Sequence, residues 1–402
     1  MFWIAVQLLD LIYNHRWTFL IVLWFFSMID YGIHAFYFSR YKPYKNDFRV
    51  PVSIVVPVFR EESDLLNKCL SAVKNQMLPD DELLIVLDGE DKNMQEIGEK
   101  YGTVYVKEHS GKRQTLAYGC DHAKNSIILT LDSDTVLCPT CLPEVIMPFK
   151  NREIGAVSAQ NRILEGDMNW TSKLADMHEI MAHYFVQKAT SAAGNVPVLY
   201  GRCLAIRKEV WQTIARDYRE KMFMGKRVES GDDNDITILT IQAGYHTFMQ
   251  FTARAFSDCP RTFWKRMNQQ YRFNRSFIRA TIDWIQHPDV IRRAKLGFFN
   301  QVTAIGLPFV VMAVWAEWVV HTMNGYHTII EITGAAAGVL TVITLTTVLM
   351  LRTLPVTMAK KGIIPWVVFS FYAWLVMNLL NVISVLTIYM EKPKLIQYSR
   401  NK

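Results

Sequence analysis

Two acidic clusters have residue types and spacings suited to chemistry on a phosphorylated substrate. Asp132-Ser133-Asp134 ends the apolar run Ile127–Asp132. The two outward carboxylates can share a hard divalent cation, Mg²⁺ or Mn²⁺, with a diphosphate. The alternative is an ordinary surface turn, because aspartates are common in the turns that follow strands. We predict Asp132 and Asp134 as residues that bind both a nucleotide and a metal.

The second acidic cluster is Gly231-Asp232-Asp233. A group transfer that inverts the reacting carbon needs a carboxylate base to deprotonate the acceptor hydroxyl opposite the leaving group. We predict Asp233 as that base and Asp232 as an acceptor-binding neighbour. Both aspartates precede the helical run Ile236–Ala243, so a helix cap is the structural alternative, and both roles can hold together.

Two features upstream favour a nucleotide ligand. Asp88 closes an earlier strand and can accept a hydrogen bond from a uracil or ribose donor. Gly111-Lys112-Arg113 opens a helix near Gln114, where backbone N–H groups and a cation can meet phosphate oxygens. We therefore predict Asp88 and Lys112 as nucleotide-binding residues.

A helix predicted at Phe263–Gln286 carries the segment Gln269-Gln270-Tyr271-Arg272-Phe273. Arg272 can stabilise a departing diphosphate, and Phe273 offers a flat apolar face for a sugar ring. Basic residues interleaved with aromatics just before an apolar span predict a helix on the membrane surface. An amphipathic core helix is the alternative.

The elements that position these residues are predicted to form a parallel sheet covered by helices. The clearest strands are Ser53–Val58, Leu83–Asp88, Thr103–Val106 and Ile127–Asp132. Helices are predicted at Ser63–Asn75, Asn93–Tyr101, Gln114–His122 and Ser172–Ala193. Because ligands of open α/β sheets bind at the carboxyl ends of strands, Asp88 and Asp132 are expected to face one pocket.

Long apolar runs flank this domain. Four runs are long enough to cross a bilayer core of about 30 Å. They are Trp17–Phe38, Leu296–Val320, Thr328–Leu351 and Ile363–Met390. Basic residues follow the first run and precede the second, which predicts a multi-pass plasma-membrane protein with a cytosolic domain. The basic C-terminal tail leaves a re-entrant pair, or a span followed by an interfacial segment, as alternatives for the last run.

This pattern predicts four parts. They are an N-terminal membrane segment (1–45), a cytosolic catalytic domain (46–262), interfacial amphipathic helices (263–295) and a C-terminal transmembrane region of about three spans (296–402). Polar and tryptophan residues in the spans, among them Asn300 and Gln301, fit a saccharide channel, with belt residues and helix packing as the alternative.

The net charge of +7 suits a membrane protein that binds diphosphates, and no nucleic-acid motif is present. All six cysteines fall in the predicted cytosolic domain, where thiols stay reduced. Cys138 and Cys141 form a CxxC pair, which invites a zinc or redox interpretation. No second pair completes a tetrahedral zinc site, so we favour a structural role.

The motifs in combination resemble the family 2 inverting glycosyltransferases with a GT-A (Rossmann-like) fold. They are VPVFRE (Val56–Glu61), LDGED (Leu87–Asp91), SGKR (Ser110–Arg113), DSD, SGDD (Ser230–Asp233) and QQYRF. The run VESGDDNDITILTIQAGYHT is similar to hyaluronan synthases, chitin-oligosaccharide synthases and the streptococcal type 3 capsule synthase. The resemblance implies uridine contacts for Glu61 and Asp88, nucleotide support by Lys112, and UDP and metal binding by Asp132 with Asp134. It also implies Asp233 as base, with Gln269, Gln270, Arg272 and Phe273 around the acceptor and diphosphate. Phe273 departs from the tryptophan usual at that position and lacks its indole N–H.

The resulting expectation is a processive transferase that polymerises a polysaccharide from UDP-sugars and threads the growing chain across the bilayer. One alternative is a transferase that moves a single sugar onto a polyprenyl phosphate. A transporter or receptor with a nucleotide-binding sensor domain is an alternative of another class. The sequence leaves the donated sugar, the linkage and the role of Arg202 open.

Overall fold

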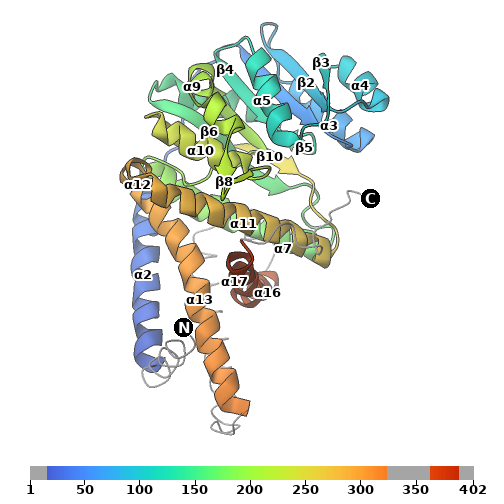
Figure 1. Cartoon of the computed structure of the whole chain (residues 1–402). Helices are drawn as coiled ribbons and strands as arrows, with labels where there is room; N and C mark the ends of the chain where they lie inside the picture. The colour runs from blue at the N-terminus through green and yellow to red at the C-terminus, as the bar shows by residue number, and fades with distance from the viewer. Residues whose placement is uncertain (1–15, 324–362, 389–402) are drawn as a thin grey trace. The chain divides into compact units, whose positions relative to one another are not determined.

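The computed structural model describes residues 16–323 and 363–388 (Figure 1). The chain divides into two compact units. One unit is Phe36–Phe299, which holds the sheet, and the other combines the residues up to Ala35 with those from Asn300 onward.

An eight-stranded mixed sheet forms the first unit, in the order β3-β2-β1-β4-β7-β6-β10-β5. Its strands are β1 (Val52–Val58), β2 (Glu82–Asp88), β3 (Thr103–Lys107), β4 (Ile127–Leu131), β5 (Thr135–Leu137), β6 (Ile154–Ile163), β7 (Cys203–Arg207) and β10 (His246–Ser257). Strands β1 to β4 pair in parallel, whereas β7 runs antiparallel to both β4 and β6. Every residue of β1 is buried, as expected for a central strand covered on both faces.

Helices cover both faces of the sheet. Alternate side chains of β1 point to opposite faces, so Ile54 and Val56 join one core and Val55 joins the other. The first core includes residues of α3 (Ser63–Lys74), α4 (Lys92–Glu99) and α6 (Cys141–Ile146). The second includes residues of α5 (Lys112–His122), α9 (Lys208–Arg219) and α10 (Asp232–Gln242). This three-layer α/β arrangement confirms the predicted class of the domain.

Two helices begin earlier in the chain than their sequences predicted. Helix α5 begins at Lys112 after Gly111, whose φ is +88°, and α10 begins at Asp232 after Gly231, whose φ is +82°. Glycine tolerates this left-handed backbone, which lets each helix start abruptly. Asp232 and Asp233 therefore lie in the first turn of α10 rather than before it.

The helix predicted at Ser172–Ala193 is interrupted. It consists of α7 (Trp170–Met181), the π-helical segment η2 (Ala182–Gln187) and α8 (Lys188–Ala192). A π-helical turn inside an α-helix is uncommon and often marks a functional position. Helix α11 (Phe263–Gln286) has the predicted bounds and is followed by α12 (Pro288–Arg293). Residues of α10, α11 and α12 form a small core that includes Ile238, Ala280 and Trp284.

Long helices form the described part of the second unit. The runs predicted at Trp17–Phe38 and Leu296–Val320 lie in α2 (Arg16–Arg40) and α13 (Lys295–Met323). The last run contains α16 (Ile363–Tyr372), the π-helical η3 (Ala373–Met377) and α17 (Asn378–Leu386). Within the described residues, Ile364–Leu386 is long and apolar enough to cross a membrane. The run Thr328–Leu351 lies outside the described residues, and the multi-pass arrangement stays a prediction.

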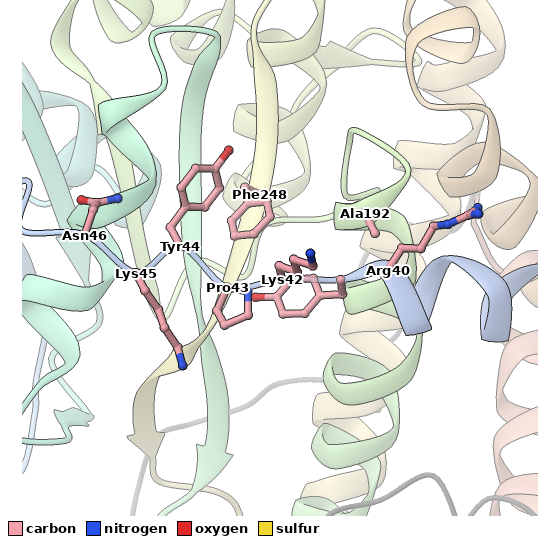
Figure 2. Close-up of a pocket in the computed structure, with 9 residues that line it drawn as sticks. Arg40, Lys42, Pro43, Tyr44, Lys45, Asn46, Ala192 and Phe248 are labelled. Atoms are coloured by element: carbon pink, nitrogen blue, oxygen red, sulfur yellow. The ribbon is translucent and has the colours of Figure 1, made fainter.

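A cavity of about 410 Å³ lies beside the segment that follows α2 (Figure 2). Its walls are Arg40, Tyr41, Lys42, Pro43, Tyr44, Lys45, Asn46, Ala192 and Phe248. The Tyr41 hydroxyl donates to the Met249 carbonyl at 2.8 Å and accepts from the Phe251 N–H at 3.0 Å. These bonds fasten the segment to β10, so the basic stretch after α2 forms part of the sheet unit.

Candidate active site

The segment Asp132-Ser133-Asp134 follows β4 and is anchored by two neighbouring segments. The Asp132 N–H donates to the Arg202 carbonyl at 3.1 Å, extending the β4–β7 ladder by one residue. The Ser133 hydroxyl donates to Glu61, which follows β1, at 3.0 Å. With the backbone and the middle side chain held in this way, the two aspartates stay within electrostatic reach of each other at the end of β4.

Lys112 brings a positive charge to these acids. Its Nζ lies 2.6 Å from Asp132 Oδ1. Desolvation opposes the charge on Lys112, but Asp132, Asp232 and Asp233 together raise its pKa. Lys112 is the first residue of α5, so its positive charge adds to the partial positive charge at the N-terminus of this helix. The lysine therefore connects the Asp132 cluster to the Asp232-Asp233 cluster.

The pKa of the Asp134 carboxyl is shifted by its surroundings. Burial, together with the negative charges of Asp132 and Glu61, raises its pKa to about 6, although Arg202 and Lys112 act in the opposite direction. Carboxylate oxygens held together against mutual repulsion are suitable ligands for a hard divalent cation. No ready-made set of three or more metal-binding side chains occurs in the described part of the chain. Asp132 and Asp134 thus fit a cation that a diphosphate helps to coordinate.

Asp233 lies in the first turn of α10, facing the backbone of Gly201. The Gly201 N–H lies 3.4 Å from Asp233 Oδ2, and the Asn234 N–H donates to Oδ1 at 2.9 Å. Burial and the charge of Asp232 raise the pKa of Asp233, while Lys112 and these N–H groups lower it. A raised pKa makes a carboxylate a stronger base at neutral pH. A Cβ at position 201 would lie 3.3 Å from Asp233 Cβ, so glycine leaves this carboxylate room.

A second, buried ion-pair network lies next to the Asp232-Asp233 cluster. The Arg113 guanidinium contacts Asp235, donates to the Tyr218 carbonyl at 2.8 Å, and lies 3.5 Å from Asp232 Oδ1. Arg279 of α11 lies 4.0 Å from the same Asp235 carboxylate and donates to the Ser230 carbonyl. These contacts fix the start of α10 between α5 and α11.

Arg202 and Glu179 complete the site and were not predicted. Arg202 Nη2 lies 3.1 Å from Glu179 Oε1 of α7. Burial opposes the charge on Arg202, but Glu179, Asp134 and Asp132 raise its pKa. The sequence signal was a single arginine in Tyr200-Gly201-Arg202-Cys203, with a partner 23 positions upstream. Nothing local in the sequence connects the two.

Asp88 supports the turn that precedes Lys112. Its carboxylate accepts from the Ser110 N–H at 2.8 Å and the Gly111 N–H at 3.0 Å, and His109 Nδ1 lies 2.9 Å away. Burial alone would raise the pKa of Asp88, but these N–H groups and His109 lower it below its usual value. The uridine contact expected of Asp88 stays a prediction, because both carboxylate oxygens already bind the turn.

The segment Gln269–Phe273 lies on α11. Gln269 Oε1 accepts from Arg266 at 2.6 Å, and the buried Gln270 donates to Asn274 at 2.8 Å. The Arg272 guanidinium lies 5.5 Å from the centre of the exposed Phe273 ring.

Of the predicted site residues, the structure brings Glu61, Lys112, Asp132, Asp134, Asp232 and Asp233 into one charged cluster. The acceptor and diphosphate roles of Gln269, Gln270, Arg272 and Phe273 stay predictions.

The sheet and the acids at its edge define a Rossmann-like GT-A domain, the fold of one class of glycosyltransferases. Residues 50–275 match the family model described as glycosyltransferase-like family 2. Because this match covers more than half of the 402 residues, the chain belongs to that family. The resemblance drawn from its motifs is confirmed.

The chain is similar to two kinds of characterised relatives. It is 26% identical over 239 residues to an N-acetylglucosaminyltransferase of Rhizobium meliloti (strain 1021), covering 57% of this chain and 56% of the relative. It is 28% identical over 274 residues to the hyaluronan synthase of Streptococcus pyogenes, covering 65% of this chain and 64% of the relative. The chain therefore spans less than two thirds of the length of these relatives.

Among solved structures, the chain is similar to the mannosyltransferase PcManGT from Pyrobaculum calidifontis in complex with GDP-Man and Mn²⁺. The TM-score is 0.65 at 15% sequence identity, and the match covers 91% of this chain and 97% of that one. At this identity the likeness shows the fold alone, and it confirms the GT-A α/β domain.

Proposed function

We propose that this family 2 glycosyltransferase is a membrane-embedded, inverting enzyme that builds a polysaccharide from UDP-sugar donors. The observation that carries the proposal is the contact of Lys112 Nζ with Asp132 Oδ1 at 2.6 Å, beside Asp134 and within electrostatic reach of Asp233. Lys112 thus lies between two pairs of acids. We propose that the diphosphate binds beside Asp132 and Asp134, and that the acceptor hydroxyl binds beside Asp232 and Asp233.

On the donor side, Asp132 and Asp134 would hold Mg²⁺ or Mn²⁺ against the diphosphate of the sugar nucleotide. The bound cation would neutralise charge that develops on the leaving group. Lys112 supplies a positive charge from the protein to the same oxygens. Glu61 positions Ser133, and Asp88 shapes the Ser110-Gly111 turn, so both support this side.

On the acceptor side, Asp233 removes the proton from the attacking hydroxyl. Its Oδ2 faces the Gly201 N–H at 3.4 Å, a long contact that leaves the oxygen available to another donor. Attack from the side opposite the leaving UDP inverts the anomeric carbon, and the proton transferred to Asp233 accompanies formation of the new glycosidic bond.

Polymer growth and export are supported by the relatives and by the apolar helices. The two relatives carry the names hyaluronan synthase and N-acetylglucosaminyltransferase, and the former names a polymer. Phe273 lies 37% exposed on α11, where its ring can contact a sugar. We propose that the apolar runs on either side of the domain anchor it at the cytosolic face of the plasma membrane and provide the path for the product.

A second candidate is the transfer of one sugar to a membrane-bound acceptor. The fold similarity to the mannosyltransferase extends over 91% of this chain, which includes the helices outside the sheet unit. An enzyme of this kind would release a product that carries a single added sugar, and it would not elongate that product.

The deciding experiment is to incubate the purified full-length protein with UDP-glucose, UDP-N-acetylglucosamine and UDP-glucuronic acid, alone and in pairs, and with GDP-mannose. Products are then sized, and their linkages are determined, with and without a chelator. We expect UDP release and a polymer that require Mg²⁺ or Mn²⁺. A product limited to one added sugar would favour the second candidate, and nucleotide binding without turnover would reject both.

A further inference from the structure

Three cysteine sulfurs lie together close to the acid site, and the transfer chemistry uses none of them. Cys138 directly follows β5, Cys141 begins α6, and Cys203 begins β7. The Cys141 thiol lies close enough to those of Cys138 and Cys203 to perturb, and be perturbed by, their ionisation. Strand β5 alone separates Cys138 from Asp134. The CxxC pair noted in the sequence is therefore a sulfur cluster in the folded protein.

The backbone between Cys138 and Cys141 is a tight turn. The Cys141 N–H donates to the Cys138 carbonyl at 3.0 Å, as in a β-turn, and the Cys138 N–H is held by the Arg254 carbonyl at 2.9 Å. The ends of a β-turn lie within about 7 Å of each other, and a disulfide joins Cα atoms about 4.4–6.8 Å apart. A turn of this kind is therefore compatible with a disulfide between its two ends.

The two thiols of this turn differ in exposure and in acidity. Cys138 is partly exposed, whereas Cys141 and Cys203 are buried. The neighbouring Cys141 thiol lowers the pKa of Cys138 to about 5, assisted by backbone contacts at Thr140 and Arg254 and opposed by burial. Conversely, the Cys138 and Cys203 thiols, together with burial, raise the pKa of Cys141. One accessible thiolate beside one protonated thiol is the arrangement of a redox-active pair.

A structural zinc site is the competing interpretation of a CxxC pair. Such sites need four ligands in a tetrahedron. No group of three or more histidine, cysteine or acidic side chains in the described ranges 16–323 and 363–388 is placed to hold a metal.

We propose that Cys138 and Cys141 form a redox-active dithiol that hydroperoxides oxidise to an intramolecular disulfide. The Cys138 thiolate attacks the terminal peroxide oxygen, the O–O bond breaks, and the leaving alkoxide takes up a proton to become an alcohol. Cys138 is then a sulfenic acid. The Cys141 sulfur attacks the Cys138 sulfur, an S–S bond forms, and the hydroxide that leaves takes the thiol proton to become water. Two thiols are oxidised, and one peroxide is reduced.

The test uses the full-length protein, reduced and then exposed to hydrogen peroxide in molar amounts equal to the protein. Remaining thiols are alkylated, and the protein is cut with trypsin. The segment 125–150 lies between Lys124 and Lys150 and contains these two cysteines and no others. We expect it to be unalkylated and lighter by two hydrogens, and dithiothreitol should restore double alkylation. A segment that remains doubly alkylated, or a cross-link of Cys141 to the segment 203–207, would overturn the proposal.

Matched variants separate the chemistry from effects on folding. In Cys141→Ser the disulfide cannot form, so Cys138 should accumulate as a sulfenic acid that dimedone traps. Cys259→Ser removes a buried cysteine outside the cluster and should leave the disulfide unchanged. In the wild-type protein at pH 6, Cys138 should react with iodoacetamide at least about tenfold faster than Cys259. Equal reactivity of the two thiols would also contradict the proposal.

Discussion

Lys112 and Arg113 are adjacent in the first turn of α5, yet they belong to two different charged regions. The open acid site comprises Glu61, Lys112, Asp132, Asp134, Asp232 and Asp233. The buried ion-pair network comprises Arg113, Asp235 and Arg279. The side chain of Lys112 is 47% exposed, whereas that of Arg113 is 3% exposed. Consecutive residues of one motif therefore face the open acid site and the protein interior respectively.

The contrast shows how one short motif can encode both chemistry and architecture. In the open acid site, burial and mutual repulsion raise the pKa of Asp134, Asp232 and Asp233, so these acids stay poorly compensated until a cation binds. In the buried network, Asp235 is contacted by two arginines and is compensated by the protein alone. We therefore expect substitutions in the first region to affect turnover and those in the second to affect folding.

The largest effect is expected for Asp134→Asn. Loss of one of two proposed metal ligands should lower transfer by about three orders of magnitude, because the charge on the leaving diphosphate is no longer neutralised. Metal-dependent binding of UDP, measured by calorimetry, should weaken with it. Asp217→Asn, an exposed change on α9, is the control and should retain full activity. Activity of Asp134→Asn within about tenfold of wild type would remove this residue from the donor site.

Arg113→Met should act on stability. It leaves Asp235 buried with only the more distant Arg279, and breaking a buried ion pair typically costs about 3–5 kcal/mol. Thermal denaturation of the purified protein should show a clearly lower midpoint than for Lys112→Met. In the double variant Arg113→Met with Asp235→Leu, both charges are removed, so less stability should be lost than in either single variant. An unchanged midpoint for Arg113→Met would abolish the distinction between the two regions.

Lys112→Met should weaken donor binding without unfolding the protein. A charge-assisted hydrogen bond to phosphate contributes about 1.5–3 kcal/mol, which corresponds to about 10- to 150-fold in the dissociation constant of UDP. The midpoint of thermal denaturation should stay near that of wild type, since the lysine is half exposed. If this variant bound UDP normally, Lys112 would serve only to compensate the acids.

The smallest effect is expected for Phe273→Trp. The position is partly exposed on α11, so a larger ring can be accommodated, and the stacking surface for a sugar increases. We expect a change in product length or acceptor KM of about threefold or less, measured by sizing the product. A loss of activity of tenfold or more would indicate that the space beside this ring is tightly filled.

Sequence patterns predicted the features that depend on residues close together in the chain. The apolar runs located β1 to β4, and the acids at the ends of β2 and β4 followed directly from them. The start of α10 was missed because it depends on Gly231, whose missing side chain leaves room for Arg279, a residue 48 positions later. A Cβ at Gly231 would lie 2.5 Å from the Arg279 guanidinium. The contact of Arg202 with Glu179 was missed for the same reason, since tertiary packing alone brings the residue before β7 to a side chain of α7.

The open acid site is proposed to use Asp233 as the base and Asp132, Asp134 and Lys112 for donor binding. This separation of roles can be tested most directly with Asp233→Asn. Binding of UDP in the presence of Mg²⁺ or Mn²⁺ and transfer from the active UDP-sugar should be measured on the same preparation. Because the substitution removes the base but keeps the shape and leaves Asp132, Asp134 and Lys112 intact, UDP should bind within about threefold of wild type while transfer falls by at least about 10³-fold. Transfer near the wild-type rate, or loss of UDP binding together with transfer, would contradict the assignment.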